Sequence, residues 1–189
     1  MLLDYATIIY RAAWVRHRAK LVGTKPPYSM RHIMDNVFPK IPVAGDKLPD
    51  GVTEMAIRQD KHRALFYSRK VNHAAQRTGL AHGLYHHLSD LKTEFGMREC
   101  SLPRRKMGMI NGQIDPVELA CDLFAAELLV PLDVLDDYAP AHLRITRQGD
   151  ADLDEIDNLS SRFNVPAGFM RWRLHELAAL RRSHFNPGY

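Results

Sequence analysis

The chain has 189 residues, of which 46% are hydrophobic and 25% charged, as expected for a soluble globular protein of one domain or one domain with an appendage. Its two cysteines, Cys100 and Cys121, exclude a disulfide framework and favour the cytoplasm, and no apolar run approaches the about 20 residues of a membrane span. The net charge of +4 permits contact with nucleic acid but does not argue for it.

The first part of the chain predicts two helices and a β-hairpin. Residues 2 to about 21 have the spacing of an amphipathic helix, and Ser29 can cap a short second helix that runs to Val37. Residues 54–59 and 64–67 predict two strands that pair around residues 60–62. The hairpin could offer an edge strand to an extended peptide or simply cover the core, and the sequence leaves both open.

The next predicted helix, from about Asn72 to Leu91, carries two histidines on one face. His82 and His86 are four residues apart, and a tetrahedral zinc can bridge such a pair. In peptidases the motif is His-Glu-x-x-His, whose Glu is the general base that activates a zinc-bound water. Gly83 stands at that position here, so the sequence has the metal-binding half of the motif without its base.

Two glycines inside this helix need an explanation. Gly79 and Gly83 each cost about 1 kcal/mol relative to Ala in a helix interior. Close approach of another element is one explanation, and decay of a once-functional helix is another. Residues 92–114, which follow the helix, contain glycines, a proline and a basic run, and we expect a long connection of the kind that often forms a lid.

A buried helix is predicted between residues 115 and 130. Asp115 is suited to the N-cap, a proline follows at the first helical position, and the segment is apolar nearly all round. Glu118 at the third position could close a capping box. Together with His82 and His86, it could instead form a His₂Glu zinc site whose fourth position is open to water or substrate. Asp122, one turn along, would then accept the free ring N–H of a ligating histidine.

A zinc site with three histidines does not fit the sequence. Such a site needs a glycine three residues and a histidine six residues after His86. Ser89 and Lys92 occupy those positions, so we reject this arrangement.

Two blocks of the sequence resemble the ImmA/IrrE family of zinc metallopeptidases. Residues 77–87 read Arg-Thr-Gly-Leu-Ala-His-Gly-Leu-Tyr-His-His, and residues 118–131 read Glu-Leu-Ala-Cys-Asp-Leu-Phe-Ala-Ala-Glu-Leu-Leu-Val-Pro. The typical family blocks are Arg-Phe-Thr-Leu-Ala-His-Glu-x-x-His-His and Glu-x-x-Ala-Asn-x-Phe-Ala-Ala-x-Leu-Leu-x-Pro. The first block departs at Thr78, Gly79 and Gly83, and the second matches closely. Residues 159–166 are similar to the segment before the family's last helix, so the resemblance covers roughly residues 25–180.

The resemblance implies an α+β fold, namely a mostly helical zincin-like metallopeptidase domain with a small β-sheet and a helical C-terminal appendage. We expect the metallopeptidase domain, with its N-terminal helix, over residues 1–140 and a helix-turn-helix-like extension packed on it over residues 141–189. His82, His86 and Glu118 would bind Zn²⁺. Members of the family are cytoplasmic proteins of bacteria and their mobile elements that cleave a helix-turn-helix repressor, which implies a role in derepression and stress responses.

Gly83 bears on the activity that the resemblance implies, because a positioned acid–base group contributes typically about 10²–10⁴-fold to a rate. We therefore expect peptidase activity to be impaired or absent. His87, one turn from Gly83, is the first candidate for a substitute base, and Tyr85 and Asp90 are others. The alternative function is that of a non-catalytic zinc-binding regulator that binds a repressor or DNA.

The C-terminal segment has two interpretations. A turn at residues 164–166 followed by a basic helix is typical of a helix-turn-helix that binds DNA, with Arg171, Arg173, Arg181 and Arg182 as the basic residues. The apolar residues of the same helix favour packing against the rest of the protein, and they are Trp172, Leu174, Leu177 and Leu180. We favour packing and expect no contact with membranes.

Overall fold

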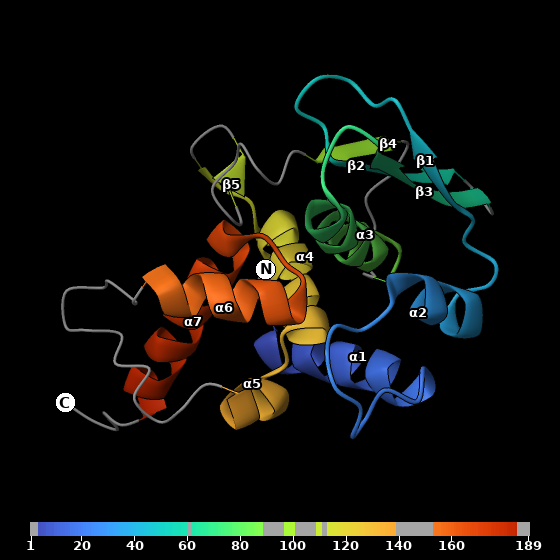
Figure 1. The fold of residues 1–189 in the computed structure, drawn as a ribbon. Coiled ribbons are helices and arrows are strands. Elements are labelled where there is room, and N and C mark those ends of the chain that lie inside the picture. The colour runs from blue at the N-terminus through green and yellow to red at the C-terminus, as the bar shows by residue number, and fades with distance from the viewer. Residues whose placement is uncertain are drawn as a thin grey trace.

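The computed structural model describes residues 4–59, 62–88, 97–100, 109–110, 113–138 and 153–184. The helices there are α1 (Tyr5–Arg18), α2 (Met30–Val37), α3 (His73–Leu88), α4 (Pro116–Leu129), α5 (Leu132–Tyr138), α6 (Leu153–Phe163) and α7 (Ala167–His184). The strands are β1 (Val43–Asp46), β2 (Glu54–Gln59), β3 (His62–Ser68), β4 (Met97–Cys100), β5 (Met109–Ile110) and β6 (Gln113–Ile114). The fold is therefore α+β and mostly helical, as predicted (Figure 1).

The sheet has the strand order β1-β3-β2-β4. The predicted hairpin is present as the antiparallel pair β2–β3, while β1 runs parallel to β3 and β4 pairs antiparallel with β2. Both hairpin strands are thus interior, and the idea that the hairpin offers an edge to a peptide is wrong. The edges are β1 and β4, which come from segments with little strand pattern of their own.

The segment between α3 and α4 also differs from the predicted connection. It contains β4, which completes the sheet, and the short pair β5–β6, which leads into α4. Strand β4 pairs with β2, which is distant in sequence, and β5 and β6 are two residues each, so the local composition of glycine, proline and basic residues did not reveal them. Residues 92–96, 101–108 and 111–112 of the expected connection lie outside the described residues, as do residues 89–91 of the predicted helix.

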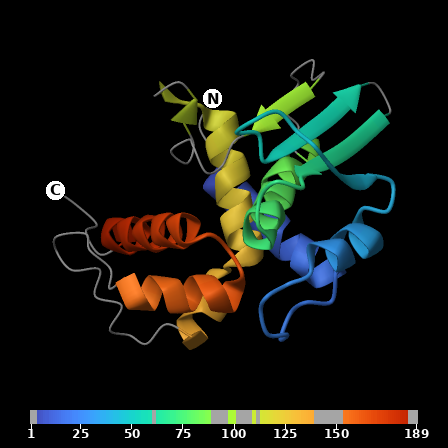
Figure 2. The ribbon, with the colours of Figure 1, turned by 45° about the horizontal axis from the view of Figure 1, so that its top comes forward.

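Helices α3 and α4 pack side by side at the centre of the molecule. The sheet covers one side of α3, and α1 packs against α4 (Figures 1 and 2). Because α3 has neighbours all round, it is buried continuously from Arg77 to His87. Its beginning is fixed by Asn72, whose Oδ1 accepts a hydrogen bond from the Ala75 amide at 2.9 Å.

Helix α4 begins as its sequence predicts. The Asp115 side chain accepts hydrogen bonds from the amides of Val117 at 2.8 Å and Glu118 at 3.2 Å, and Pro116 occupies the first helical position. The helix is almost entirely buried. Glu118 and Asp122 are therefore carboxylates in the protein interior, where they need polar partners.

The C-terminal helices α6 and α7 form an antiparallel pair beside α4 (Figure 2). Arg173 of α7 is fully buried, donates from Nε to the Val130 carbonyl at 3.1 Å, and forms ion pairs with Glu127 and Glu176. Tyr5 of α1 donates to Glu176 at 2.5 Å. Helix α7 thus packs on the rest of the protein. In the part of the chain that the structure describes, no helix has the length and apolar character needed to cross a membrane.

Candidate metal centre

The histidines of α3 face the acidic residues of α4. His82 and His86 are both buried, at 0% and 3% exposure, and their rings meet edge to face with centroids 5.0 Å apart. The two Nε2 atoms are 3.2 Å apart. At this distance at most one proton fits between them, so at least one nitrogen presents a lone pair to the shared space.

Glu118 reaches the same point from the first turn of α4. Its Oε2 is 3.2 Å from Nε2 of His82, and its Oε1 is 3.6 Å from Nε2 of His86. Zinc bonds of about 2.0–2.2 Å in a tetrahedron give ligand–ligand separations of about 3.3–3.5 Å. The three donors therefore have the chemistry and the mutual distances that suit a zinc ion.

Hydrogen bonds behind the histidines set the orientation of their rings. Asp122 accepts at 2.7 Å from Nδ1–H of His82, which leaves the lone pair on Nε2. Cys121 Sγ lies 3.5 Å from Nδ1 of His86. The sequence indicated the contact of Asp122 through its spacing from Glu118. Cys121 was not anticipated, because its contact with His86 depends on how α3 and α4 meet.

Cys121 is itself a possible metal ligand. One potential ligand atom from each of His82, His86 and Cys121 lies within 4.8 Å of the other two. The thiol, however, is beside Nδ1 of His86, whereas Glu118 is beside the facing Nε2 atoms of both histidines. The convergence of both imidazoles therefore favours Glu118 as the third donor, with Cys121 behind His86.

The two glycines of α3 lie where the sheet approaches most closely. A Cβ at Gly83 would be 2.9 Å from Cδ2 of Leu65 on β3, and a Cβ at Gly79 would be 2.7 Å from Oε2 of Glu54 on β2. Real Cβ atoms essentially never show such short contacts. Close approach of another element is thus the physical reason for both glycines, one of the two explanations that the sequence left open.

Two residues predicted as substitutes for the missing base, His87 and Tyr85, have their own contacts away from the facing histidine nitrogens. His87 Nε2 is 3.2 Å from the carbonyl oxygen of Ala64, to which it donates, and burial lowers the pKa of its ring to about 4. Tyr85 packs against Phe124, with a centroid distance of 4.8 Å, under the guanidinium of Arg11. Asp90 lies outside the described residues. A role of His87 as base stays a prediction, and its low basicity weakens it.

Glu54 was missed by the sequence reasoning. It is the first residue of β2, is fully buried, and has Oε1 at 3.9 Å from Nε2 of His82. Thr53 donates from its hydroxyl to Oε2. The signal that could have found it is the period of two in a strand, because Ala56 points to the core and Glu54 shares its face.

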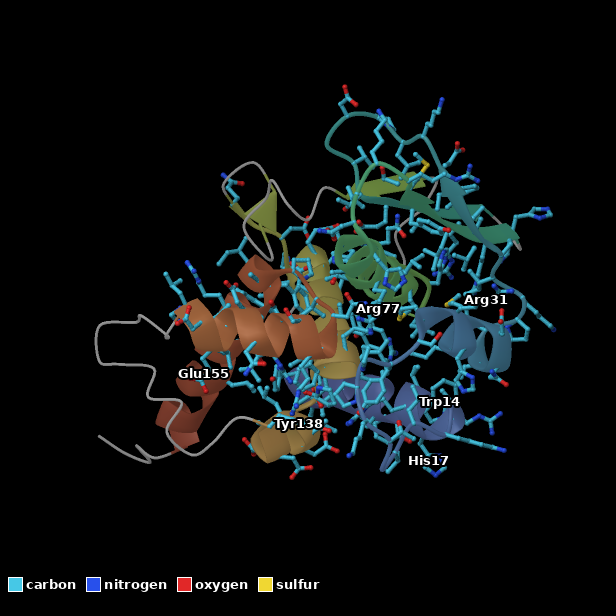
Figure 3. The ribbon with its side chains drawn as sticks, in the orientation of Figure 1. Trp14, His17, Arg31, Arg77, Tyr138 and Glu155 are labelled. Carbon is cyan, nitrogen blue, oxygen red and sulfur yellow. The ribbon has the colours of Figure 1, made fainter. Side chains whose placement is uncertain are left out.

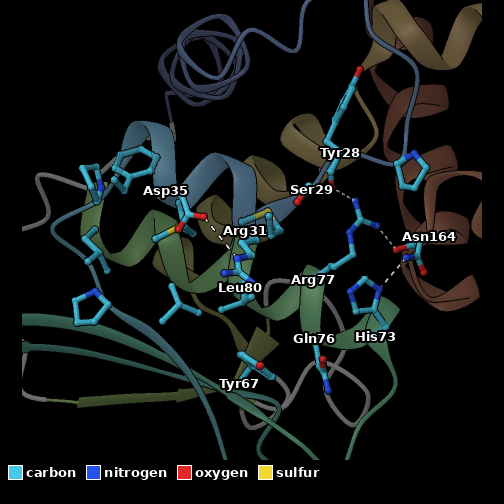
Figure 4. A pocket seen from close by; sticks show the side chains of 18 residues that line it. Tyr28, Ser29, Arg31, Asp35, Tyr67, His73, Gln76, Arg77, Leu80 and Asn164 are labelled. Carbon is cyan, nitrogen blue, oxygen red and sulfur yellow. Dashed lines mark hydrogen bonds and ion pairs between the residues drawn. The ribbon is translucent and has the colours of Figure 1, made fainter.

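A separate pocket of about 720 Å³ lies away from the histidine cluster, between α2, β1 and the beginning of α3 (Figure 4). Arg77 of α3 lines it and donates to the carbonyls of Tyr28 at 2.6 Å and Phe163 at 2.8 Å, and also to that of Asn164. Figure 3 shows Arg77 where α3 faces the end of α6. Burial lowers the pKa of this guanidinium to about 10, so it stays charged at neutral pH and joins three parts of the fold.

The fold and the histidine–carboxylate cluster define a domain of the metallopeptidase class. A family model for the IrrE N-terminal-like domain, Peptidase_M78, matches residues 39–175, which is well over half of the chain. The chain therefore belongs to the ImmA/IrrE family of metallopeptidases, as the resemblance implied. No curated protein matches it significantly. The matched segment runs across residue 140, so the expected domain boundary there stays a prediction.

Proposed function

We propose that this chain is a zinc metalloendopeptidase of the ImmA/IrrE type that acts on a helix-turn-helix repressor in the cytoplasm, with hydrolysis impaired or absent because Gly83 replaces the general base. The observation that carries the proposal is the convergence of three donors. Nε2 of His82 and Nε2 of His86 are 3.2 Å apart, and the oxygens of the Glu118 carboxylate lie 3.2 Å from the first and 3.6 Å from the second. This set provides the His₂Glu donors of a catalytic zinc site.

Each residue has a defined part in this proposal. His82, His86 and Glu118 hold the zinc, which when bound supplies a Lewis acid that polarises a substrate carbonyl. Asp122 keeps His82 in the tautomer with a free Nε2, because it accepts the Nδ1 proton at 2.7 Å. Gly83 offers no group that can take a proton, so a rate lower by about 10²–10⁴-fold than with a positioned carboxylate is expected.

A second candidate function is that of a non-catalytic zinc-binding regulator that holds the repressor without cleaving it. The observation that favours it is the side chain of Leu65, which lies 2.9 Å from the point where a Cβ of residue 83 would begin. A side chain at position 83 would therefore require Leu65 to move. Slow cleavage and sequestration without cleavage are two possible results of the same proposed interaction, the binding of the repressor to this protein.

Direct binding to DNA is the weaker alternative. Of the arginines that suggested it, Arg171 is exposed, but Arg173 is fully buried in ion pairs with Glu127 and Glu176. A buried guanidinium with carboxylate partners cannot neutralise a phosphate without losing them. This argues against a role of Arg173 in binding DNA.

The test combines the zinc-loaded protein with a candidate helix-turn-helix repressor and follows both its size and its association. Slow cleavage at one bond that a chelator stops supports the peptidase, and a stable complex without cleavage supports the regulator. A repressor neither cleaved nor bound, together with salt-sensitive binding to duplex DNA, overturns the proposal in favour of the DNA-binding alternative.

A further inference from the structure

Glu54 is a carboxylate that the fold holds against the metal centre from the side opposite α4. It is fully buried on the face of the sheet that packs on α3. The hydroxyl of Thr53 donates to its Oε2, and its Oε1 lies 3.9 Å from Nε2 of His82. A charged side chain at the start of a strand usually faces solvent. The Glu54 side chain instead points into the protein, where the sheet packs on α3.

The two glycines of α3 make the room for this carboxylate. A Cβ at Gly79 would lie 2.7 Å from Oε2 of Glu54 and 3.2 Å from its Cβ and Cδ. A Cβ at Gly83 would lie 3.7 Å from Cγ of Glu54. The side chain of Glu54 therefore occupies space into which a side chain on α3 would otherwise project, and it enters that space from β2.

Glu54 lies beside the candidate site, next to His82. Nε2 of His82 has Glu118 at 3.2 Å and Glu54 at 3.9 Å, while Nε2 of His86 is at 3.2 Å. Tetrahedral zinc requires ligand separations of about 3.3–3.5 Å. The last torsion of a glutamate is broad, so a small rotation can bring Oε1 to that distance from Nε2 of His82.

We propose that Glu54 is a fourth protein ligand of the metal, so that His82, His86, Glu118 and Glu54 form a closed His₂Glu₂ site. This inference rests on the proposed metal site and deepens it. Counted over the four proposed ligands alone, two carboxylates and two neutral imidazoles neutralise a divalent cation. Structural zinc sites are closed by four protein ligands, whereas catalytic sites keep one position open. A closed site agrees with the absence of a base at Gly83 and favours sequestration of the repressor over its cleavage.

The test measures the zinc dissociation constant by competition with a chromophoric chelator, and the visible absorption of the Co²⁺-loaded protein. Glu54→Gln keeps the size of the side chain and is expected to weaken zinc binding at least about 10-fold and to change the Co²⁺ bands, since a ligand is lost. Glu127→Gln is the matched control. It alters another buried glutamate, which contacts Arg16 and Arg173, and should leave both readouts unchanged.

A second variant reaches Glu54 without altering it. Gly79→Ala places a methyl group where Oε2 of Glu54 lies, while the better helix propensity of Ala supports the fold. It should therefore change zinc affinity and the Co²⁺ bands in the same direction as Glu54→Gln.

The outcomes separate this inference from the proposed function. Equal zinc affinity and identical Co²⁺ spectra in wild type and Glu54→Gln overturn the fourth ligand and leave the His₂Glu site intact. The same result with loss of repressor binding assigns Glu54 a role outside the coordination shell, which also overturns this inference. A wild-type chain that binds no zinc overturns both.

Discussion

Two buried polar clusters lie along helix α4, and they differ in what completes them. At the C-terminal end, Glu127 is paired with Arg173 and lies 3.6 Å from Arg16, so guanidinium groups of α7 and α1 supply permanent positive charge. At the N-terminal end, Glu118 faces the imidazoles of His82 and His86. Imidazoles are charged only when protonated, and neutral ones offer lone pairs. The first cluster is an internal ion pair that stabilises the fold, whereas the second has the composition of a cation site.

Removal of a guanidinium from the first cluster should have the largest effect on stability. Arg173→Leu leaves Glu127 buried with the longer contact to Arg16, and loss of one partner of a buried ion pair costs about 3–5 kcal/mol. Burial already raises the pKa of Glu127, against the opposing effect of Arg173 and Arg16. Urea denaturation measures the free energy of unfolding.

The control for this variant is Arg162→Leu. Arg162 is exposed and stacks over the ring of Tyr138 at 4.4 Å, a contact worth about 0.5–1 kcal/mol. If Arg173→Leu costs no more than this control, the first cluster does not stabilise the fold in the way described.

The second cluster can be tested with an acid at position 83. Gly83→Glu forces a side chain against Leu65 and Glu54, and overpacking of this kind costs about 1–3 kcal/mol. We expect a lower melting temperature and no restored cleavage of a repressor. Gly168→Glu is the matched control, because a Cβ there meets nothing within 4 Å. A Gly83→Glu protein as stable as this control would contradict the packing at the sheet.

The smallest effect is expected where only the orientation of a ligand changes. Asp122→Ala removes the acceptor of the Nδ1 proton of His82 and should weaken zinc binding about 10-fold. Asp122→Asn keeps an acceptor oxygen and should bind zinc nearly as well as wild type. Titration with a competing chelator compares the three proteins, and equal affinities would show that Asp122 does not orient His82.

The parts of the fold that the sequence predicted depend on local signals. The Ser29 cap, the hairpin, the two histidines one turn apart and the Asp115–Pro116 start of α4 all arise from neighbours in sequence. The interior position of the hairpin in the sheet could not be predicted in this way, because β1 and β4, which flank it, come from elsewhere in the chain.

The candidate site divides in the same way. The spacing of residues within α3 and within α4 indicated His82, His86, Glu118 and Asp122. Glu54 depends on how the sheet lies across α3, and the contact of Cys121 with His86 depends on how two helices meet. Such contacts are set by tertiary packing. The alternation of a strand can place Glu54 on the buried face of β2, but no local pattern shows that it meets His82. The role of Gly79 likewise becomes clear only beside Glu54.

The measurement that tests the central claim most directly is the zinc content of the protein purified without chelator, beside His86→Ala. His86 faces both His82 and Glu118, so its loss removes a donor from the centre of the cluster. The account predicts about one zinc per wild-type chain and a large loss of zinc in the variant. Wild-type protein without zinc, or equal zinc in both proteins, would contradict the metal centre described for α3 and α4.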